Sequence, residues 1–94
     1  MTEAELLAKV KIGLFGSDAG TWRDETLTVY IDEVKEFMQS AGVPVEVINS
    51  KASVGCILTG VNDLWNYSGG DVKFSEYFHM RLVQLASGSG GGSA

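Results

Sequence analysis

The chain has 94 residues, with twelve Asp and Glu against seven Lys and Arg, and a formal net charge of −5 at pH 7. This length suits one domain, and a hydrophobic share of 45% excludes a chain that is disordered throughout. The acidic balance argues against a domain that grips a nucleic-acid backbone, and the single cysteine excludes an internal disulfide.

Residues 2–15 predict a helix with one apolar stripe. Leucine, valine and phenylalanine recur there at three- and four-residue steps, which is the period of a helix with one buried face. Thr2 and Glu5 have the spacing of a capping box, which satisfies free amides at a helix start. Lys9 and Lys11 are expected on the opposite, polar side.

A second helix is predicted from Trp22 to Ala41, after a polar and glycine-containing loop over residues 16–21. Thr21 is expected to cap its start. Its end is predicted at Gly42, which suits a left-handed C-terminal cap, followed by Pro44 as a stop.

Residues 43–48 (VPVEVI) fit either a short strand or one helical turn, and a lone strand would have no partner in this chain. The helical turn is therefore favoured. A third helix is predicted over residues 51–66, capped by Asn49 or Ser50. Two glycines inside it are expected to let a neighbouring helix come close: Gly55 and Gly60.

Ser75 is expected to cap a fourth helix. The side chains predicted to face inward are those of Tyr77, Phe78, Leu82 and Leu85, and those predicted to face outward are those of Glu76, Arg81 and Gln84. These elements predict an all-α fold, a small four-helix, bundle-like domain with short loops over residues 1–87. Residues 88–94 (GSGGGSA) are interpreted as a flexible Gly/Ser linker or a remnant of expression.

The sequence holds little that could support catalysis. Cys56 and His79 are the only thiol and imidazole, and we expect a buried structural thiol and a histidine at the core edge or on a contact surface. One Cys and one His cannot form a structural zinc site, and no calcium or phosphate loop has the required spacing. The sequence therefore predicts no enzyme, no cofactor and no metal.

Two groups of side chains are candidates for contacts. Aromatic residues crowd the last third of the chain, where most would end the core and the exposed remainder could anchor a partner. The predicted subunit or portal interface comprises Trp65, Tyr67, Phe74, Tyr77, Phe78 and Arg81. The polar side of the second helix is acidic and is predicted to comprise Asp24, Asp32 and Glu36, either as a solvated face or as one that anionic molecules pass.

Several segments of the chain resemble the head–tail connector proteins of tailed bacteriophages. They are residues 60–67 (GVNDLWNY), 74–78 (FSEYF) and 81–85 (RLVQL), preceded by 30–34 (YIDEV) and 41–44 (AGVP). The resemblance spans residues 3–86 and consists of apolar spacing together with the Asp-Leu-Trp-Asn and Arg-x-x-Gln-Leu segments. It implies a small helical protein without catalytic activity.

The resemblance also implies partners and a location. Members form a ring beneath the portal, here expected to hold about a dozen copies, which extends the DNA channel at the head–tail junction of the virion. The expected partners are further copies of the chain, the portal protein and the next head-completion or tail protein. DNA would pass the acidic face without sequence-specific binding, and no membrane is involved. Synthesis is expected in the bacterial host cytoplasm.

An alternative interpretation is a small helical DNA-binding or regulatory module of prophage origin. Such a module would need a basic recognition helix. The Lys and Arg residues are instead scattered along the sequence, which favours the connector.

Overall fold

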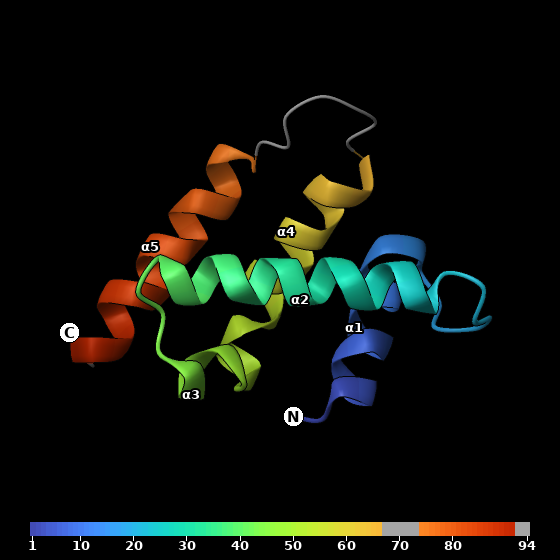
Figure 1. Cartoon of the computed structure of the whole chain (residues 1–94), viewed down its shortest axis with the longest axis horizontal. Helices are drawn as coiled ribbons and strands as arrows, with labels where there is room; N and C mark the ends of the chain where they lie inside the picture. The colour runs from blue at the N-terminus through green and yellow to red at the C-terminus, as the bar shows by residue number, and fades with distance from the viewer. Residues whose placement is uncertain (67–73, 92–94) are drawn as a thin grey trace.

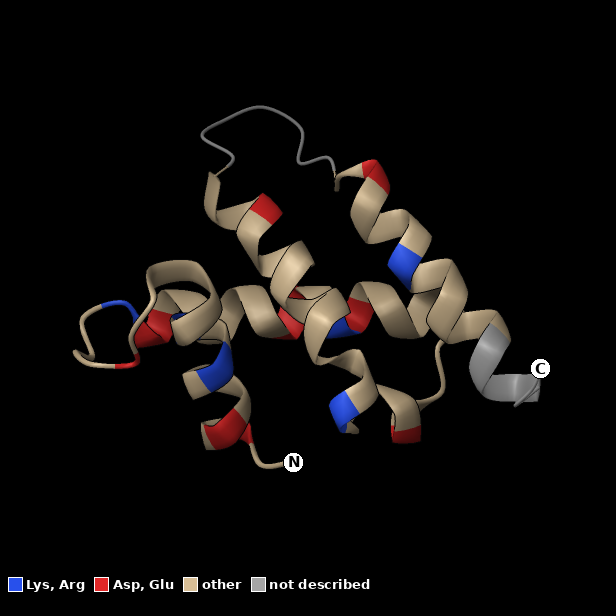
Figure 2. Ribbon diagram, turned by 180° about the vertical axis from the view of Figure 1, so that it is seen from behind, with Lys and Arg blue, Asp and Glu red and all other residues tan. Residues whose placement is uncertain are grey.

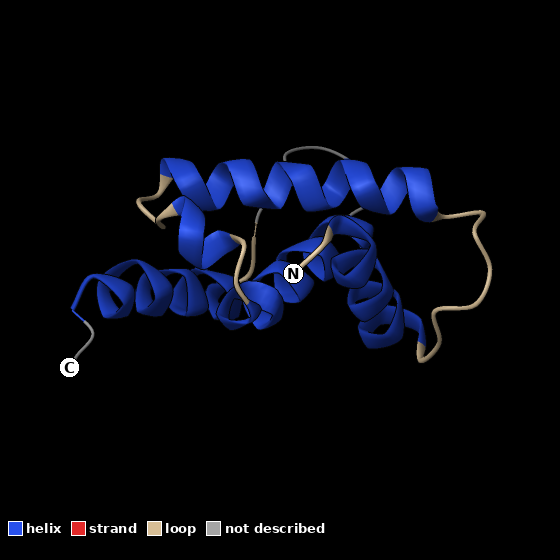
Figure 3. Ribbon diagram, turned by 90° about the horizontal axis from the view of Figure 1, so that it is seen from below, coloured by secondary structure: helices blue, strands red, loops and turns tan. Residues whose placement is uncertain are grey.

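Helices dominate the computed structural model, which describes residues 1–66 and 74–91 (Figure 1). They are α1 (Glu3–Phe15), α2 (Asp24–Ser40), α3 (Val45–Ile48), the 3₁₀ turn η1 (Lys51–Ser53), α4 (Val54–Asn66) and α5 (Glu76–Gly91). No strand occurs in these two ranges (Figure 3). The all-α prediction is confirmed, and the turn over residues 43–48 is helical as favoured.

The helices lie in two layers. Seen from below, α2 forms one layer and α1, α4 and α5 form the other (Figure 3). Helix α4 is the centre of the packing, because α1, α2 and α5 all contact it. The layers bury a common set of apolar side chains that are at most 2% exposed: Leu6 and Val10 of α1, Leu27, Val34 and Met38 of α2, Ile57 and Val61 of α4, and Phe78 of α5.

The predicted capping box starts α1. The Thr2 hydroxyl accepts a hydrogen bond from the Glu5 N–H, and the Glu5 carboxylate accepts one from the Thr2 N–H, both at 3.1 Å. These bonds to Thr2 lower the pKa of Glu5, because they favour its ionised form. Each bond satisfies an amide that would otherwise lack a partner at the helix start.

The two ends of α2 compare differently with prediction. The helix starts at Asp24 rather than Trp22, and the Thr21 side chain does not cap it. Instead the Thr21 carbonyl accepts the Asp24 N–H in a turn, at 3.1 Å, which leaves Trp22 outside the helix. The other end is as predicted, with Gly42 in the left-handed region at φ 101°. The Gly42 N–H donates to Gln39 and the Val43 N–H donates to Met38, which is the Schellman pattern.

Small residues in α4 set the spacing of the helices, as the sequence predicts. At Gly60 a Cβ atom would lie 2.7 Å from the Phe78 ring and 2.9 Å from Val34. At Gly55 a Cβ would overlap the Arg81 guanidinium. Because α2 and α5 both approach Gly60, a side chain there would push one of them away.

The start of α5 is tied to the end of α4. Ser75 donates from both its N–H and its hydroxyl to Asp63, each at 2.9 Å. The Ser75 hydroxyl also accepts the Phe78 N–H at 3.2 Å, which confirms Ser75 as the cap. Asp63 therefore acts in the framework of the fold.

The burial pattern of α5 corrects the prediction at two positions. Phe78 and Leu82 are buried and Leu85 is half-buried, as expected, but Tyr77 is 53% exposed. The buried stripe of α5 consists of Phe78, Leu82 and Leu85. Because the helix turns about 100° per residue, Tyr77 points about 100° away from Phe78 and faces the outside. Arg81 was predicted to face outward and is half-buried, since its guanidinium lies over Gly55.

Helix α5 runs to Gly91, so its last turn enters the segment interpreted as a linker. The domain boundary at residue 87 stays a prediction, and residues 92–94 lie outside the described ranges. None of the described helices is both long enough and apolar enough to span a bilayer.

Candidate functional site

Three of the aromatic residues predicted as one interface, Trp65, Phe74 and Phe78, belong to two separate clusters against the core. Phe74 stacks on Phe78 with 4.4 Å between ring centroids, and Phe37 of α2 lies 4.9 Å from Phe74. Trp65 instead meets Phe15 and Tyr30 edge-on, at 5.3 and 6.3 Å. The first cluster fixes α5 to α2, and the second joins α4 to α1 and α2.

The structure therefore removes one residue from the predicted interface. Phe78 is fully buried, so it cannot contact a partner while the chain is folded. Trp65, Phe74 and Arg81 are half-buried, whereas Tyr77 is exposed. Tyr67 lies outside the described residues.

An exposed apolar stripe runs along α5. Tyr77, Met80 and Val83 are 53%, 53% and 62% exposed, and they follow one another at three-residue steps. Residues three apart are neighbours on a helix, so the stripe winds across the outer side of α5, with Tyr77 and Val83 about 120° apart. Arg81 borders this stripe, with its guanidinium carbon 5.8 Å from the centroid of the Tyr77 ring. The outer side of α5 thus offers apolar side chains that the other described helices leave exposed.

The predicted acidic face is divided by the fold. Asp24 is turned inward and forms an ion pair with Lys11, at 2.8 Å. This corrects both the outward placement of Asp24 and the polar placement of Lys11, which is 7% exposed. The pairing follows from the tertiary fold, which brings the start of α2 against α1.

Asp32 and Glu36 remain exposed and lie together. They line a groove of about 270 Å³ between α2 and α3, with Val45 and Ile48 among its apolar lining residues. Lys35 also lines this groove. The carboxylates of Asp32 and Glu36 therefore lie on the surface, whereas Asp24 contributes to the packing of α2 against α1.

Lys11 also holds the loop between α1 and α2. Its ammonium donates to the carbonyl of Gly20 in addition to its pairing with Asp24. Sequence reasoning missed this role, although a signal was present. Lys11 lies four residues from Leu7 and four from Phe15, which places it on the apolar stripe.

The sequence also did not predict the arrangement of Trp22 and Arg23 at the end of this loop. Trp22 is 76% exposed. The guanidinium of Arg23 lies between two rings, 3.8 Å from the centroid of Phe15 and 4.0 Å from that of Trp22. Guanidinium groups stack favourably on aromatic faces, so Arg23 fixes the position of the Trp22 indole.

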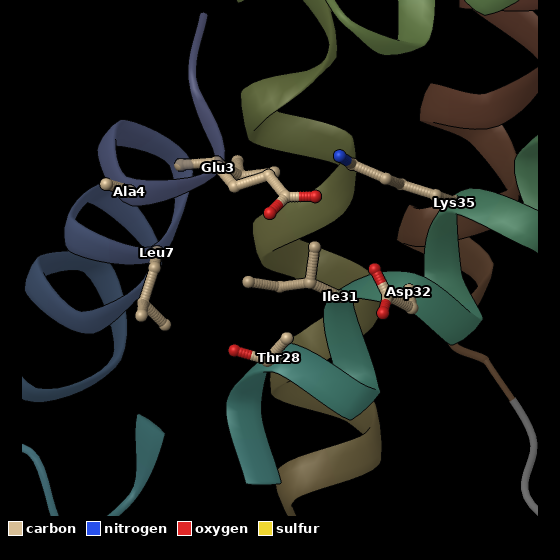
Figure 4. Close-up of a pocket in the computed structure, with 8 residues that line it drawn as sticks. Glu3, Ala4, Leu7, Thr28, Ile31, Asp32 and Lys35 are labelled. Carbon is tan, nitrogen blue, oxygen red and sulfur yellow. The ribbon is translucent and has the colours of Figure 1, made fainter. Parts of the chain in front are cut away.

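A second, smaller groove separates the first turns of α1 from α2 (Figure 4). Leu7 and Ile31 give it apolar lining, and the Lys35 side chain extends across it toward Glu3 (Figure 4). Its volume is about 170 Å³. This is below the ~300–1,000 Å³ of typical small-molecule sites, and it suits a single side chain better than a substrate.

Cys56 and His79, the one thiol and the one imidazole of the sequence, lie in different surroundings. Cys56 is fully buried, and its burial raises the pKa of its thiol to about 11, with a smaller opposing effect of Arg81. His79 is exposed on α5, beside the rings of Phe37 and Phe78. Residues 1–66 and 74–91 contain no group of three or more His, Cys, Asp or Glu that could hold a metal ion.

Cys56 is expected to be inert in the folded protein. A thiol-reactive disulfide reagent at pH ~8 should label it at least about a hundredfold more slowly than an ordinary cysteine, because little thiolate forms and access is blocked. The rate is followed by absorbance, with the same protein in denaturant as the fully reactive control. Rapid labelling under native conditions would contradict the buried position.

Lys and Arg residues do not gather on one helix of the described structure. They are spread over α1, the following loop, α2, η1 and α5 (Figure 2). Acidic side chains lie between them. No helix within residues 1–66 and 74–91 carries a cluster of basic residues.

Comparisons with protein-family models, with curated proteins and with solved structures find no match to this chain. Its class is therefore defined by the fold, as a small all-α protein with an exposed apolar stripe on its last helix.

Proposed function

We propose that this chain is a structural virion protein of a tailed bacteriophage, an adaptor that forms a ring between the portal and the next head-completion or tail protein. In this role it extends the DNA channel at the head–tail junction. The proposal has its origin in the sequence segments at 60–67, 74–78 and 81–85. The all-α fold is compatible with it.

The observation that carries the proposal is the stripe of Tyr77, Met80 and Val83 on α5. A helix side with three large apolar groups each more than half exposed is typical of a protein-contact surface. Aromatic residues and methionine are also enriched at such contacts. An adaptor needs surfaces of this kind for its neighbours in the ring and for the portal.

The charge of the chain supports the passage of DNA. Each copy carries −5, and a ring of about a dozen copies would repel the phosphate backbone instead of adhering to it. The exposed carboxylates of α2 contribute to this charge. The alternative DNA-binding module gains no support from the scattered basic side chains.

Mixing the chain with the portal protein from the same genome tests the proposal. We expect portal-bound rings by electron microscopy and a matching increase in mass. Changing Tyr77 and Met80 together to serine should weaken this attachment by about tenfold or more, because apolar contact area is lost.

The matched control is Ile12→Ser, which changes a 51% exposed apolar residue on a different helix. It should leave attachment unchanged, and circular dichroism should show that both variants remain folded. Equal attachment of the Tyr77/Met80 variant and the wild type would count against the α5 surface, and no binding of the wild type would refute the adaptor.

A further inference from the structure

The Trp22–Arg23 pair, defined here as the knob, presents an exposed indole with a guanidinium stacked on it. Trp22 has the largest exposed fraction among the large apolar side chains of the described residues. Arg23 forms no ion pair within those residues, and its Nε is buried without a hydrogen-bond partner. A fixed indole beside an unpaired guanidinium combines the two side chains that contribute most strongly at protein interfaces.

The groove between α2 and α3 has the complementary chemistry. Asp32 and Glu36 supply two carboxylates, and Val45, which is 48% exposed, supplies apolar surface. Lys35 is the one basic residue that lines it, and its side chain extends toward Glu3 of α1 (Figure 4). A groove of about 270 Å³ with carboxylates at its wall can take an aromatic ring together with a guanidinium.

We propose that the knob of one copy inserts into the groove of a second copy. The guanidinium of Arg23 then pairs with Asp32 or Glu36, and the Trp22 indole packs on Val45. This inference rests on the proposed ring, because it names the contact between subunits. It moves Asp32 and Glu36 from the channel wall to the subunit boundary.

The positions of the two surfaces give the contact a direction. The knob precedes the first residue of α2. The groove is lined by residues from the second half of α2 and by residues of α3, which lies near the opposite end of α2 (Figure 1). One copy therefore cannot fill its own groove. Each copy that inserts its knob leaves its own groove open, and such a head-to-tail contact produces a ring if the rotation closes.

Self-association of the purified chain tests this contact without the portal. By sedimentation equilibrium and native mass spectrometry up to about 1 mM, the wild type should associate with increasing concentration. Trp22→Ala and Glu36→Arg should each reduce the association constant by about thirtyfold or more. A 1:1 mixture of these two variants should form a dimer and nothing larger, because it contains one intact knob and one intact groove per pair.

A charge exchange gives a second test. Arg23→Glu alone should lose association, and the chain with both Arg23→Glu and Glu36→Arg should recover it at least tenfold, since the two charges have changed places. The controls are Ile12→Ala and Lys9→Glu, which alter exposed residues of α1 that belong to neither the knob nor the groove and should associate like the wild type.

Three results would overturn the contact: a wild type that stays monomeric over this range, variants that associate as strongly as the wild type, or a mixture that yields no dimer. Measuring portal binding distinguishes a failure of the knob–groove contact from a failure of the proposed adaptor function. Rings on the portal that survive Trp22→Ala and Glu36→Arg would refute the contact alone. A wild type that associates but never binds the portal would refute the adaptor alone.

Discussion

Replacing Phe78 with alanine is expected to lower the free energy of unfolding by about 3–5 kcal/mol, the range for deleting a large aromatic ring from a packed core. Phe78 is fully buried and stacks on Phe74, and its ring centroid lies 5.8 Å from that of Phe37. It also fills the space over Gly60. Truncation leaves a cavity where α2, α4 and α5 meet. Urea unfolding followed by circular dichroism measures the change.

The neighbouring residue provides the control. Tyr77→Ala removes a ring of similar size from the exposed side of the same helix, and its cost should stay within about 0.5 kcal/mol. The pair of variants thus separates the core role of Phe78 from the surface role of Tyr77. Equal losses of stability in the two variants would contradict the assigned burial.

Replacing Lys11 with methionine is expected to cost about 2–3 kcal/mol, which is less than for a fully buried ion pair because Asp24 is partly exposed. Methionine retains most of the apolar stem of the side chain, so the loss of stability measures the contribution of the Lys11 ammonium group. Asp24 would lose its partner, and the Gly20 carbonyl would lose its donor. Urea unfolding measures the stability, and amide exchange over residues 16–23 measures the order of the loop.

Lys9→Met is the matched control, because Lys9 lies on the same helix but is exposed. It should change stability by no more than about 0.5 kcal/mol. In a double-mutant cycle with Asp24→Asn, Lys11 and Asp24 should show a coupling of about 1–2 kcal/mol. Additive effects of the two changes, with unaltered exchange in the loop, would show that Lys11 does not hold the loop.

Local patterns predicted the helices well. The Thr2–Glu5 box, the left-handed Gly42 and the Ser75 cap each act through bonds between residues close in sequence, so their spacing is sufficient to locate them. Apolar periodicity similarly located most of the buried positions. Gly55 and Gly60 were correctly expected at close helix approaches, although the sequence did not show which side chains would meet them.

Contacts between distant elements could not be predicted in this way. Asp24 looks like a solvated residue in the first turn of a helix until the fold brings Lys11 beside it. The aromatic residues near the C-terminus are adjacent in sequence, yet Trp65 joins α1 while Phe74 joins α2. The exposure of Trp22 depends on where α2 starts. The predicted start was two residues too early, so the sequence did not indicate that Trp22 has the most exposed aromatic side chain of the described chain.

Helix α2 has a mechanical consequence for any assembly built from this chain. Its 17 residues include neither glycine nor proline, so it spans about 25 Å without the residues that commonly allow a helix to kink. The Trp22 loop and the α3 turn are attached to its two ends (Figure 1). It therefore acts as a rigid spacer, and the curvature of a closed array would be set by the angle at which two such spacers meet.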